Sequence, residues 1–104
     1  MNKHLQFLFT YFGMAENKAD VEWKKWFIEQ KNKLDSGEEI DPPWICFPNS
    51  SPIHGWNQGY QEAWKNDVWV TFWNKLNNAE KENYLNRRKP PSEDWHETIM
   101  IYWH

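Results

Sequence analysis

The histidines are the residues best suited to bind a metal, but their spacing does not favour it. They are His4, His54, His96 and His104. His96 and Glu97 begin like the zinc-binding pattern HExxH, but Met100 stands where the second histidine is needed. Two imidazoles on one helix face require that spacing to reach the same zinc ion. The sequence therefore predicts no metal site and no cofactor.

Cys46 is the only cysteine and the strongest candidate nucleophile. It could meet His54 or His96 in space as a thiolate–imidazole pair. The alternative, which its ring-rich surroundings favour, is a small buried residue in an aromatic loop. No G-x-S-x-G pattern and no glycine-rich phosphate loop occurs in the chain. We therefore expect a protein that is not an enzyme and has no catalytic residues.

The acidic residues gather at two places in the sequence. One group precedes a proline-rich segment and the other begins the last expected helix: Asp35, Glu38, Glu39 and Asp41, then Glu93, Asp94 and Glu97. Carboxylates beside helix ends often only complement the helix dipole or face solvent. An acidic patch can also steer a basic partner to its binding site. On this second interpretation Glu38, Glu39 and Asp41 are candidate partner-binding residues.

A compact basic run, Arg87-Arg88-Lys89, follows one expected helix. With Tyr84 or Trp95 beside it, the run could contact a phosphate backbone while a ring stacks on a base. Cations at a helix C-terminus also complement the helix dipole, and we favour this simpler role. Arg87, Arg88 and Lys89 stay as possible anion-binding residues.

Aromatic residues are the main anomaly of the composition. They make up 18% of the chain, and nine of its 104 residues are tryptophan. Each ring can bury roughly 150–250 Å², so we expect a core made of rings rather than of aliphatic side chains. We also expect some rings to stay at the surface, where tryptophan and tyrosine are enriched in binding hot spots. The candidates are Trp44, Phe47 and Trp103.

Length and charge bound the remaining possibilities. We expect residues 1–104 to form a single domain, because domains of about this length are common. The net charge of −3 does not favour binding to nucleic acid through bulk charge. One cysteine excludes an internal disulfide, and no apolar run is long enough to span a membrane. These features indicate a cytoplasmic protein.

The elements that must hold these residues are mainly helical. Asn17 and Asp20 have the spacing of a capping box and Gly37 is typical of a helix end, which together predict a helix over about residues 18–35. Three prolines exclude a regular helix over residues 38–50, and we expect this apolar segment to lie across the domain with some of its rings inserted.

Residues 51–76 contain four tryptophans and a helical period. Ser51-Pro52 is typical of a helix start. The apolar arcs of the two halves point in nearly opposite directions at 100° per residue, so we expect a break at Asn66-Asp67; one continuous kinked helix is the alternative. Gly55 and Gly59 would lie on one helix face, where the proline-rich segment or a ligand could approach closely.

The remaining elements are two helices and one ambiguous pair of ends. Asn77 and Glu80 predict a capping box for a short helix, and Ser92 starts a last helix with acids in its first turn. We expect residues 3–13 to be helical too. The end of the chain, TIMIYWH, suits a strand as well as a helix. The fold expected is a small bundle of about four to six helices; the alternative is an α+β domain in which the terminal segment pairs with residues 5–12.

Two functions from different classes fit these observations. The first is a non-enzymatic protein-binding module, a small cytoplasmic inhibitor of the immunity-protein, antitoxin or phage anti-defence kind that blocks a basic partner protein sterically. The second is a ligand-binding domain that uses aromatic platforms to hold a nucleic-acid strand, a nucleotide or a sugar. Self-association into a homo-oligomer is a third possibility.

Overall fold

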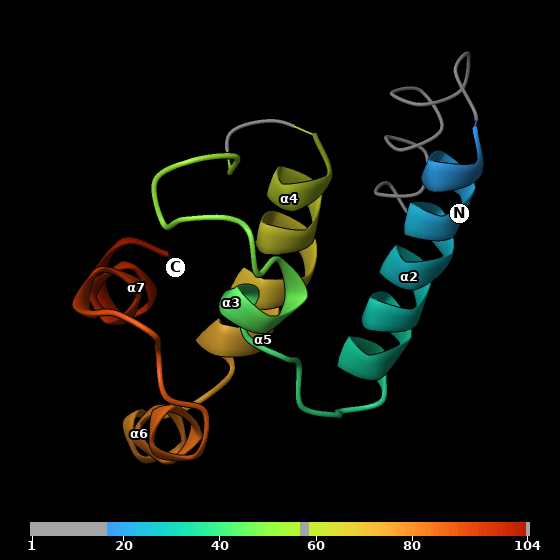
Figure 1. Ribbon diagram of the computed structural model, residues 1–104. Helices are drawn as coiled ribbons and strands as arrows, with labels where there is room; N and C mark the ends of the chain where they lie inside the picture. The colour runs from blue at the N-terminus through green and yellow to red at the C-terminus, as the bar shows by residue number, and fades with distance from the viewer. Residues whose placement is uncertain (1–16, 57–58, 104) are drawn as a thin grey trace.

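The structure, a computed structural model, describes residues 17–56 and 59–103, and every regular element in these ranges is helical (Figure 1). Five helices occur in this part of the chain, counting each run of adjoining turns as one. The prediction of a mainly helical fold is confirmed. A strand at the C-terminus is wrong, because residues 98–102 continue the last helix. The predicted helix over residues 3–13 lies outside the described residues.

Helix α2 spans Lys18–Asp35 and begins and ends as its sequence predicts. The Asn17 side chain accepts a hydrogen bond from the Asp20 backbone N–H at 3.0 Å, and Asp20 accepts one from the Asn17 N–H at 3.4 Å. At the other end Gly37 has φ +79°. Its N–H donates to the carbonyl of Leu34 and the N–H of Glu38 donates to that of Lys33. This is the Schellman arrangement, which satisfies carbonyls that a helix end leaves open.

The proline-rich segment contains one helical turn that its sequence does not predict. This turn, α3, spans Pro43–Cys46, with Pro42 as its N-cap. Proline is tolerated at the first helical position because that N–H has no partner within the helix. Pro42, Pro43 and Ile40 are fully buried. The segment therefore crosses the domain and enters the core, as predicted.

Residues 51–56 form a turn rather than the predicted start of a helix. The Ser51 hydroxyl accepts hydrogen bonds from the backbone N–H groups of Ile53 and His54, so it caps a local turn. Gly55 has φ +89°, a left-handed conformation that interrupts a right-handed helix. A Cβ at Gly55 would also collide with the Gln61 side chain. Helix α4 begins only later and spans Gly59–Trp64.

The predicted break at Asn66-Asp67 is replaced by a wide helical turn. A π-helical turn, η1, spans Lys65–Trp69 and leads without interruption into α5, Val70–Asn74. A π turn closes i→i+5 hydrogen bonds instead of i→i+4. The extra residue changes the direction of the side chains that follow. Opposite apolar arcs can therefore both reach the core from one continuous helix, the alternative considered above.

The last two helices begin with the predicted caps. Helix α6 spans Asn78–Arg87 and follows a complete capping box between Asn77 and Glu80. Helix α7 spans Glu93–Glu97, and the Ser92 hydroxyl accepts a hydrogen bond from the Trp95 N–H. A second π turn, η2, extends it over Thr98–Tyr102.

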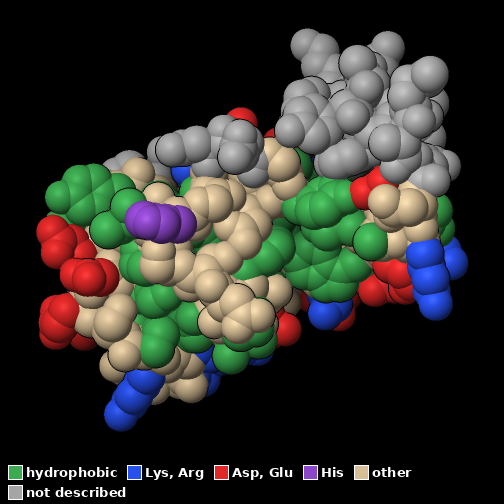
Figure 2. Space-filling view, turned by 45° about the horizontal axis from the view of Figure 1, so that its top comes forward, with side chains coloured by type: hydrophobic (Ala, Val, Ile, Leu, Met, Phe, Trp, Pro, Cys, Tyr) green, Lys and Arg blue, Asp and Glu red, His purple; other side chains and the backbone are tan. Residues whose placement is uncertain are grey.

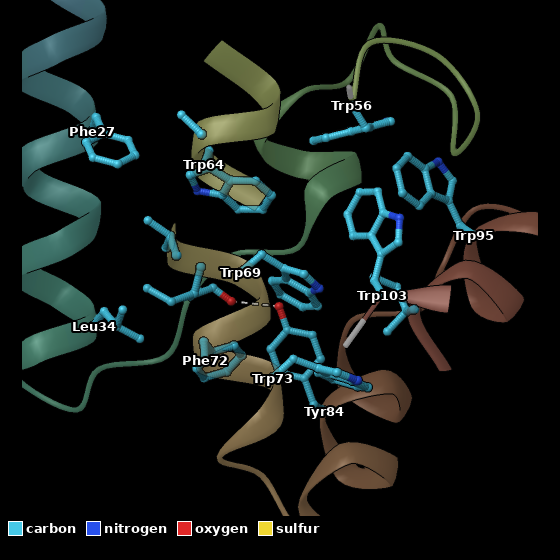
Figure 3. Packing of buried hydrophobic residues seen from close by; sticks show 14 of the residues in the cluster. Phe27, Leu34, Trp56, Trp64, Trp69, Phe72, Trp73, Tyr84, Trp95 and Trp103 are labelled. Atoms are coloured by element: carbon cyan, nitrogen blue, oxygen red, sulfur yellow. Dashed lines mark hydrogen bonds between the residues drawn. The ribbon is translucent and has the colours of Figure 1, made fainter. Parts of the chain in front are cut away.

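The core is built mainly of rings, as the composition predicts. Trp64, Trp69 and Trp73 form a stacked row along α4, η1 and α5, with centroids 6.0 and 5.4 Å apart. Tyr84 of α6 packs against this row, and its hydroxyl donates a 2.7 Å hydrogen bond to the Ile40 carbonyl (Figure 3). Trp56, Trp95 and Trp103 form a second group between the 51–56 turn and the last helix. Within the described ranges, no helix is both long and apolar enough to cross a membrane.

Candidate functional site

The acidic loop and the basic run, predicted as separate contact surfaces, meet in one ionic cluster. Arg87 holds both carboxylate oxygens of Glu39, with its nitrogens at 2.7 and 3.3 Å. Arg88 lies 3.0 Å from Glu39 and 2.6 Å from Asp41. Four of the predicted site residues therefore bind one another.

This pairing changes what the cluster can offer to a partner. The hydrogen bond from Arg87, together with the charges of both arginines, holds the pKa of Glu39 below its usual range against the effect of burial. The cluster ties the end of α6 to the segment after α2, and its charges largely cancel. Glu38 and Lys89 stay exposed beside it. The ionic cluster is better explained as a clasp between segments than as an open acidic or anion-binding surface.

The three predicted aromatic anchors are at least partly covered. Trp103 is only 6% exposed, so the expectation that its ring lies at the surface is wrong. It is covered because Trp56 and Trp95 pack on it at 4.7 and 5.6 Å. Phe47 is half-buried with its ring edge-on to Trp26, Trp56 and Trp64, and Trp44 is half-buried 5.9 Å from Trp95. These rings join the proline-rich segment to the core.

Cys46 is poorly suited to nucleophilic chemistry. Burial raises the pKa of its thiol to about 12, so the thiol stays protonated near neutral pH, whereas the thiolate is the reactive form. Its sulfur lies 3.6 Å from the Asp41 carbonyl oxygen, a contact typical of a structural cysteine. No group of three potential metal ligands occurs in the described part of the chain.

A different surface presents apolar side chains to solvent. Ile53 is 76% exposed, Tyr102 68% and Ile101 55%. Among the tryptophan, tyrosine and phenylalanine residues that the structure describes, Tyr102 is the only exposed one. Ile53 and Tyr102 border a hollow of about 190 Å³ whose other lining residues are Pro52, Asp94, Glu97 and Thr98. Ile101 does not line this hollow but directly precedes Tyr102 in the last helix. We call Ile53, Asp94, Glu97, Ile101 and Tyr102 together the terminal surface.

The terminal surface lies at one end of the molecule. Its helix, α7 with η2, is on the opposite side of the domain from α2 (Figure 1). Figure 2 shows hydrophobic side chains at this left-hand end, directly beside acidic side chains and a histidine. The surface therefore combines apolar area with negative charge.

The buried side of the turn explains why Ile53 points outward. The Trp56 indole N–H donates a 2.7 Å hydrogen bond to the Ser51 carbonyl. The same indole packs edge-on against Trp95 and Trp103 of the last helix, at 6.0 and 4.7 Å. The turn is thus fixed to the last helix by its buried residue Trp56, while the side chain of Ile53 stays in solvent.

The carboxylates of the terminal surface differ from those of the ionic cluster. In the part of the chain that the structure describes, no basic side chain forms an ion pair with Asp94 or Glu97. Lys65, a cation near this end, lies over the Trp103 ring, 5.1 Å from its centroid. Asp94 and Glu97 are both exposed, so their negative charges are accessible to a partner.

Sequence reasoning missed Ile53, Ile101 and Tyr102. Ile53 follows Ser51-Pro52, where a helix start was predicted, and that helix start is absent. Serine, proline and glycine at positions 51, 52 and 55 are all turn formers, and this signal could have placed Ile53 outside. No local signal shows which face of TIMIYW is exposed, because the π turn changes the period.

The comparisons with known proteins give no match: no family model fits the chain, and no curated protein or solved structure is significantly similar to it.

Proposed function

We propose that this protein is a non-enzymatic protein-binding module that antagonises another protein by covering part of its surface. The observation that carries the proposal is the terminal surface, where Ile53, Ile101 and Tyr102 are exposed while most rings are buried. The proposed surface differs from the one predicted around Trp44 and Glu39.

Exposed apolar area next to a hollow suits a binding surface. Single exposed apolar residues are ordinary, but grouped ones rimmed by polar residues mark interaction sites. Burying apolar area contributes roughly 25 cal/mol per Å², and tyrosine is enriched at binding hot spots. Ile53 and Tyr102 could supply this contribution on contact with a partner.

Charge supports a basic partner. Asp94 and Glu97 border the apolar group, and the chain as a whole carries a net charge of −3. Complementary charge speeds association and suppresses wrong partners. A basic nucleic-acid-binding or active site is the kind of surface that an inhibitor of the immunity-protein, antitoxin or phage anti-defence kind would cover. Steric occlusion requires no catalytic group in the inhibitor.

The aromatic-platform function has less support. All nine tryptophans are buried or half-buried. Base or sugar stacking needs an open ring face, and the indoles mainly pack on one another. We therefore propose protein binding alone.

Site-specific photo-crosslinking in the cells that produce the protein tests this proposal. A photoreactive residue replaces Tyr102, and a matched variant carries it at Ile28, an exposed residue of α2 (42% exposed). We expect a protein adduct from position 102 and not from position 28. The purified adduct partner should lose its activity when wild-type protein is added. Adducts at position 28 alone, or a partner whose activity does not change, would contradict the proposal.

A further inference from the structure

Building on the proposed function, we infer that the terminal surface binds a basic peptide segment of its partner through one apolar side chain. That side chain enters the hollow between Ile53 and Tyr102, while lysine or arginine side chains next to it in the segment pair with Asp94 and Glu97.

The size of the hollow limits what can enter it. Its volume is about 190 Å³, whereas pockets for small-molecule ligands are usually about 300–1,000 Å³. The lining combines the apolar groups of Pro52, Ile53 and Tyr102 with the Thr98 side chain. One aliphatic or aromatic side chain fits this description better than a complete cofactor or nucleotide.

The carboxylates of Asp94 and Glu97 favour lysine or arginine in the bound segment, on either side of the apolar side chain. Asp94 and Glu97 are three positions apart on the last helix and both line the hollow, as i, i+3 residues share a helix face. Because neither pairs with a cation of the described chain, a basic segment need not displace an internal partner. The ionic cluster lacks this property, since Arg87 and Arg88 already occupy Glu39 and Asp41.

Charge disfavours a second copy of this chain as the occupant. Two copies that meet through one patch place the same residues against each other. Asp94 and Glu97 would then face the identical carboxylates of the other copy, and like charges across an interface are unfavourable. A positively charged segment avoids this repulsion.

The site is also held in place before binding. The Trp56 indole joins the Ser51 carbonyl to the rings of Trp95 and Trp103, so both walls of the hollow rest on one buried ring group. A preformed site loses less conformational freedom on binding. A short peptide should therefore bind measurably without the rest of the partner.

Fluorescence anisotropy with short labelled peptides tests the inference. The probe is a flexible lysine-rich peptide with one central leucine. Two comparison peptides carry either serine in place of the leucine or glutamate in place of the lysines. We expect the serine peptide to bind about ten- to a hundredfold more weakly, because burial of one aliphatic side chain is lost. The glutamate peptide should not bind, and added salt should weaken the binding of the leucine peptide.

Variants of the protein provide the matched controls. Asp94→Asn and Glu97→Gln should each weaken the leucine peptide about two- to fivefold, and Ile53→Ser about tenfold or more. The controls E22Q/E29Q and Ile28→Ser change exposed residues of α2 and should leave binding unchanged. Circular dichroism establishes that each variant is folded. Equal binding of the leucine and serine peptides, or full binding by the D94N/E97Q variant, would overturn the inference.

The inference and the proposed function can fail separately. If position 102 crosslinks to a protein that wild-type protein inhibits but no basic peptide binds, the peptide chemistry is wrong and the antagonist function stands. If position 102 crosslinks only to a second copy of the chain, both are wrong.

Discussion

The aromatic core and the terminal surface use similar residues in opposite ways. In the core, Trp64, Trp69 and Trp73 are almost completely buried, so their apolar area contributes to folding. At the terminal surface, Ile53 and Tyr102 keep most of their area in water, so they contribute little to folding. Their apolar area would be removed from water when a partner covers it. Substitutions should therefore separate into those that change stability and those that change binding.

The carboxylates show the same contrast. Glu39 and Asp41 are paired with Arg87 of α6 and with Arg88, its C-cap, so their negative charges are neutralised within the molecule. Asp94 and Glu97 have no such pairing among the described residues. The position of an acidic group in the fold, rather than its presence in the sequence, decides whether it can attract a partner.

Removing a ring from the core should have the largest effect. Trp69 stacks between Trp64 and Trp73 and is fully buried. We expect Trp69→Ala to lower the free energy of unfolding by about 3–5 kcal/mol, because it leaves a cavity as well as losing buried area. Urea unfolding followed by circular dichroism measures the change. Trp69→Phe, which keeps a ring, is the control and should cost clearly less; equal costs would show that the row tolerates a cavity.

Gly55→Ala should have the next largest effect, because it strains the turn that carries Ile53. The left-handed backbone costs a residue with a Cβ about 1–2 kcal/mol. The new Cβ would also displace the end of the Gln61 side chain, whose amide donates a hydrogen bond to the Ser50 hydroxyl. Gly37→Ala is the matched control, since Gly37 has a similar φ of +79° but open space around it. Thermal unfolding should show a larger loss of stability for Gly55→Ala than for Gly37→Ala. If the two losses are equal, crowding by Gln61 plays no part.

Tyr84→Phe should lower the free energy of unfolding by about 1 kcal/mol. The change keeps the ring and removes only the hydroxyl that donates to the Ile40 carbonyl at 2.7 Å, and a typical internal hydrogen bond contributes about 0.5–1.5 kcal/mol. Urea unfolding is again the measurement. Tyr102→Phe, at the exposed ring of the terminal surface, is the control and should leave stability unchanged. A loss from Tyr102→Phe as large as that from Tyr84→Phe would remove the distinction between core and surface.

The helix starts predicted from a capping residue at Asn17, Asn77 and Ser92 are confirmed, whereas the start predicted at Ser51-Pro52 is wrong. Caps depend on residues three positions apart, so Asn17 with Asp20 and Asn77 with Glu80 were recognisable locally. The π turns at Lys65–Trp69 and Thr98–Tyr102 depend on how rings pack across the domain, and no local pattern encodes that.

The candidate site was harder to predict than the fold, because burial is a property of the whole domain. The acidic loop and the basic run were both recognised, but Glu39 and Arg87 are 48 residues apart, and only the packing of α6 brings them together. Trp103 was a predicted surface ring, whereas Trp56 and Trp95 cover it.

Glu39→Gln should have a small effect that depends on pH. Because Arg87 lowers the pKa of Glu39 in the folded protein, the ionised pair stabilises the fold above the unfolded pKa of about 4.3, and this contribution disappears as the pH falls through the lower folded pKa. The stability difference between wild type and Glu39→Gln should therefore be present at neutral pH and shrink in acid. Glu38→Gln, a neighbouring exposed carboxylate without an arginine partner, is the control. A difference that does not change between neutral and acidic pH would show that the ion pair contributes nothing.

The smallest expected effect on stability separates the two regions most sharply. Ile53→Ser and Tyr102→Ser should change the free energy of unfolding by no more than about 0.5 kcal/mol, as is usual for surface substitutions, because both side chains are already in water. Ile99→Ser is the matched control, because Ile99 lies on the same helix as Tyr102 but is fully buried. This substitution should lower the free energy of unfolding several times more. Peptide binding should show the reverse order among folded variants, because Ile53→Ser and Tyr102→Ser should bind the leucine peptide more weakly. If instead Ile53→Ser unfolds as readily as Ile99→Ser, the turn belongs to the core and its exposed side chain holds the fold together. If stability is kept and binding is lost, these residues serve the partner and not the fold.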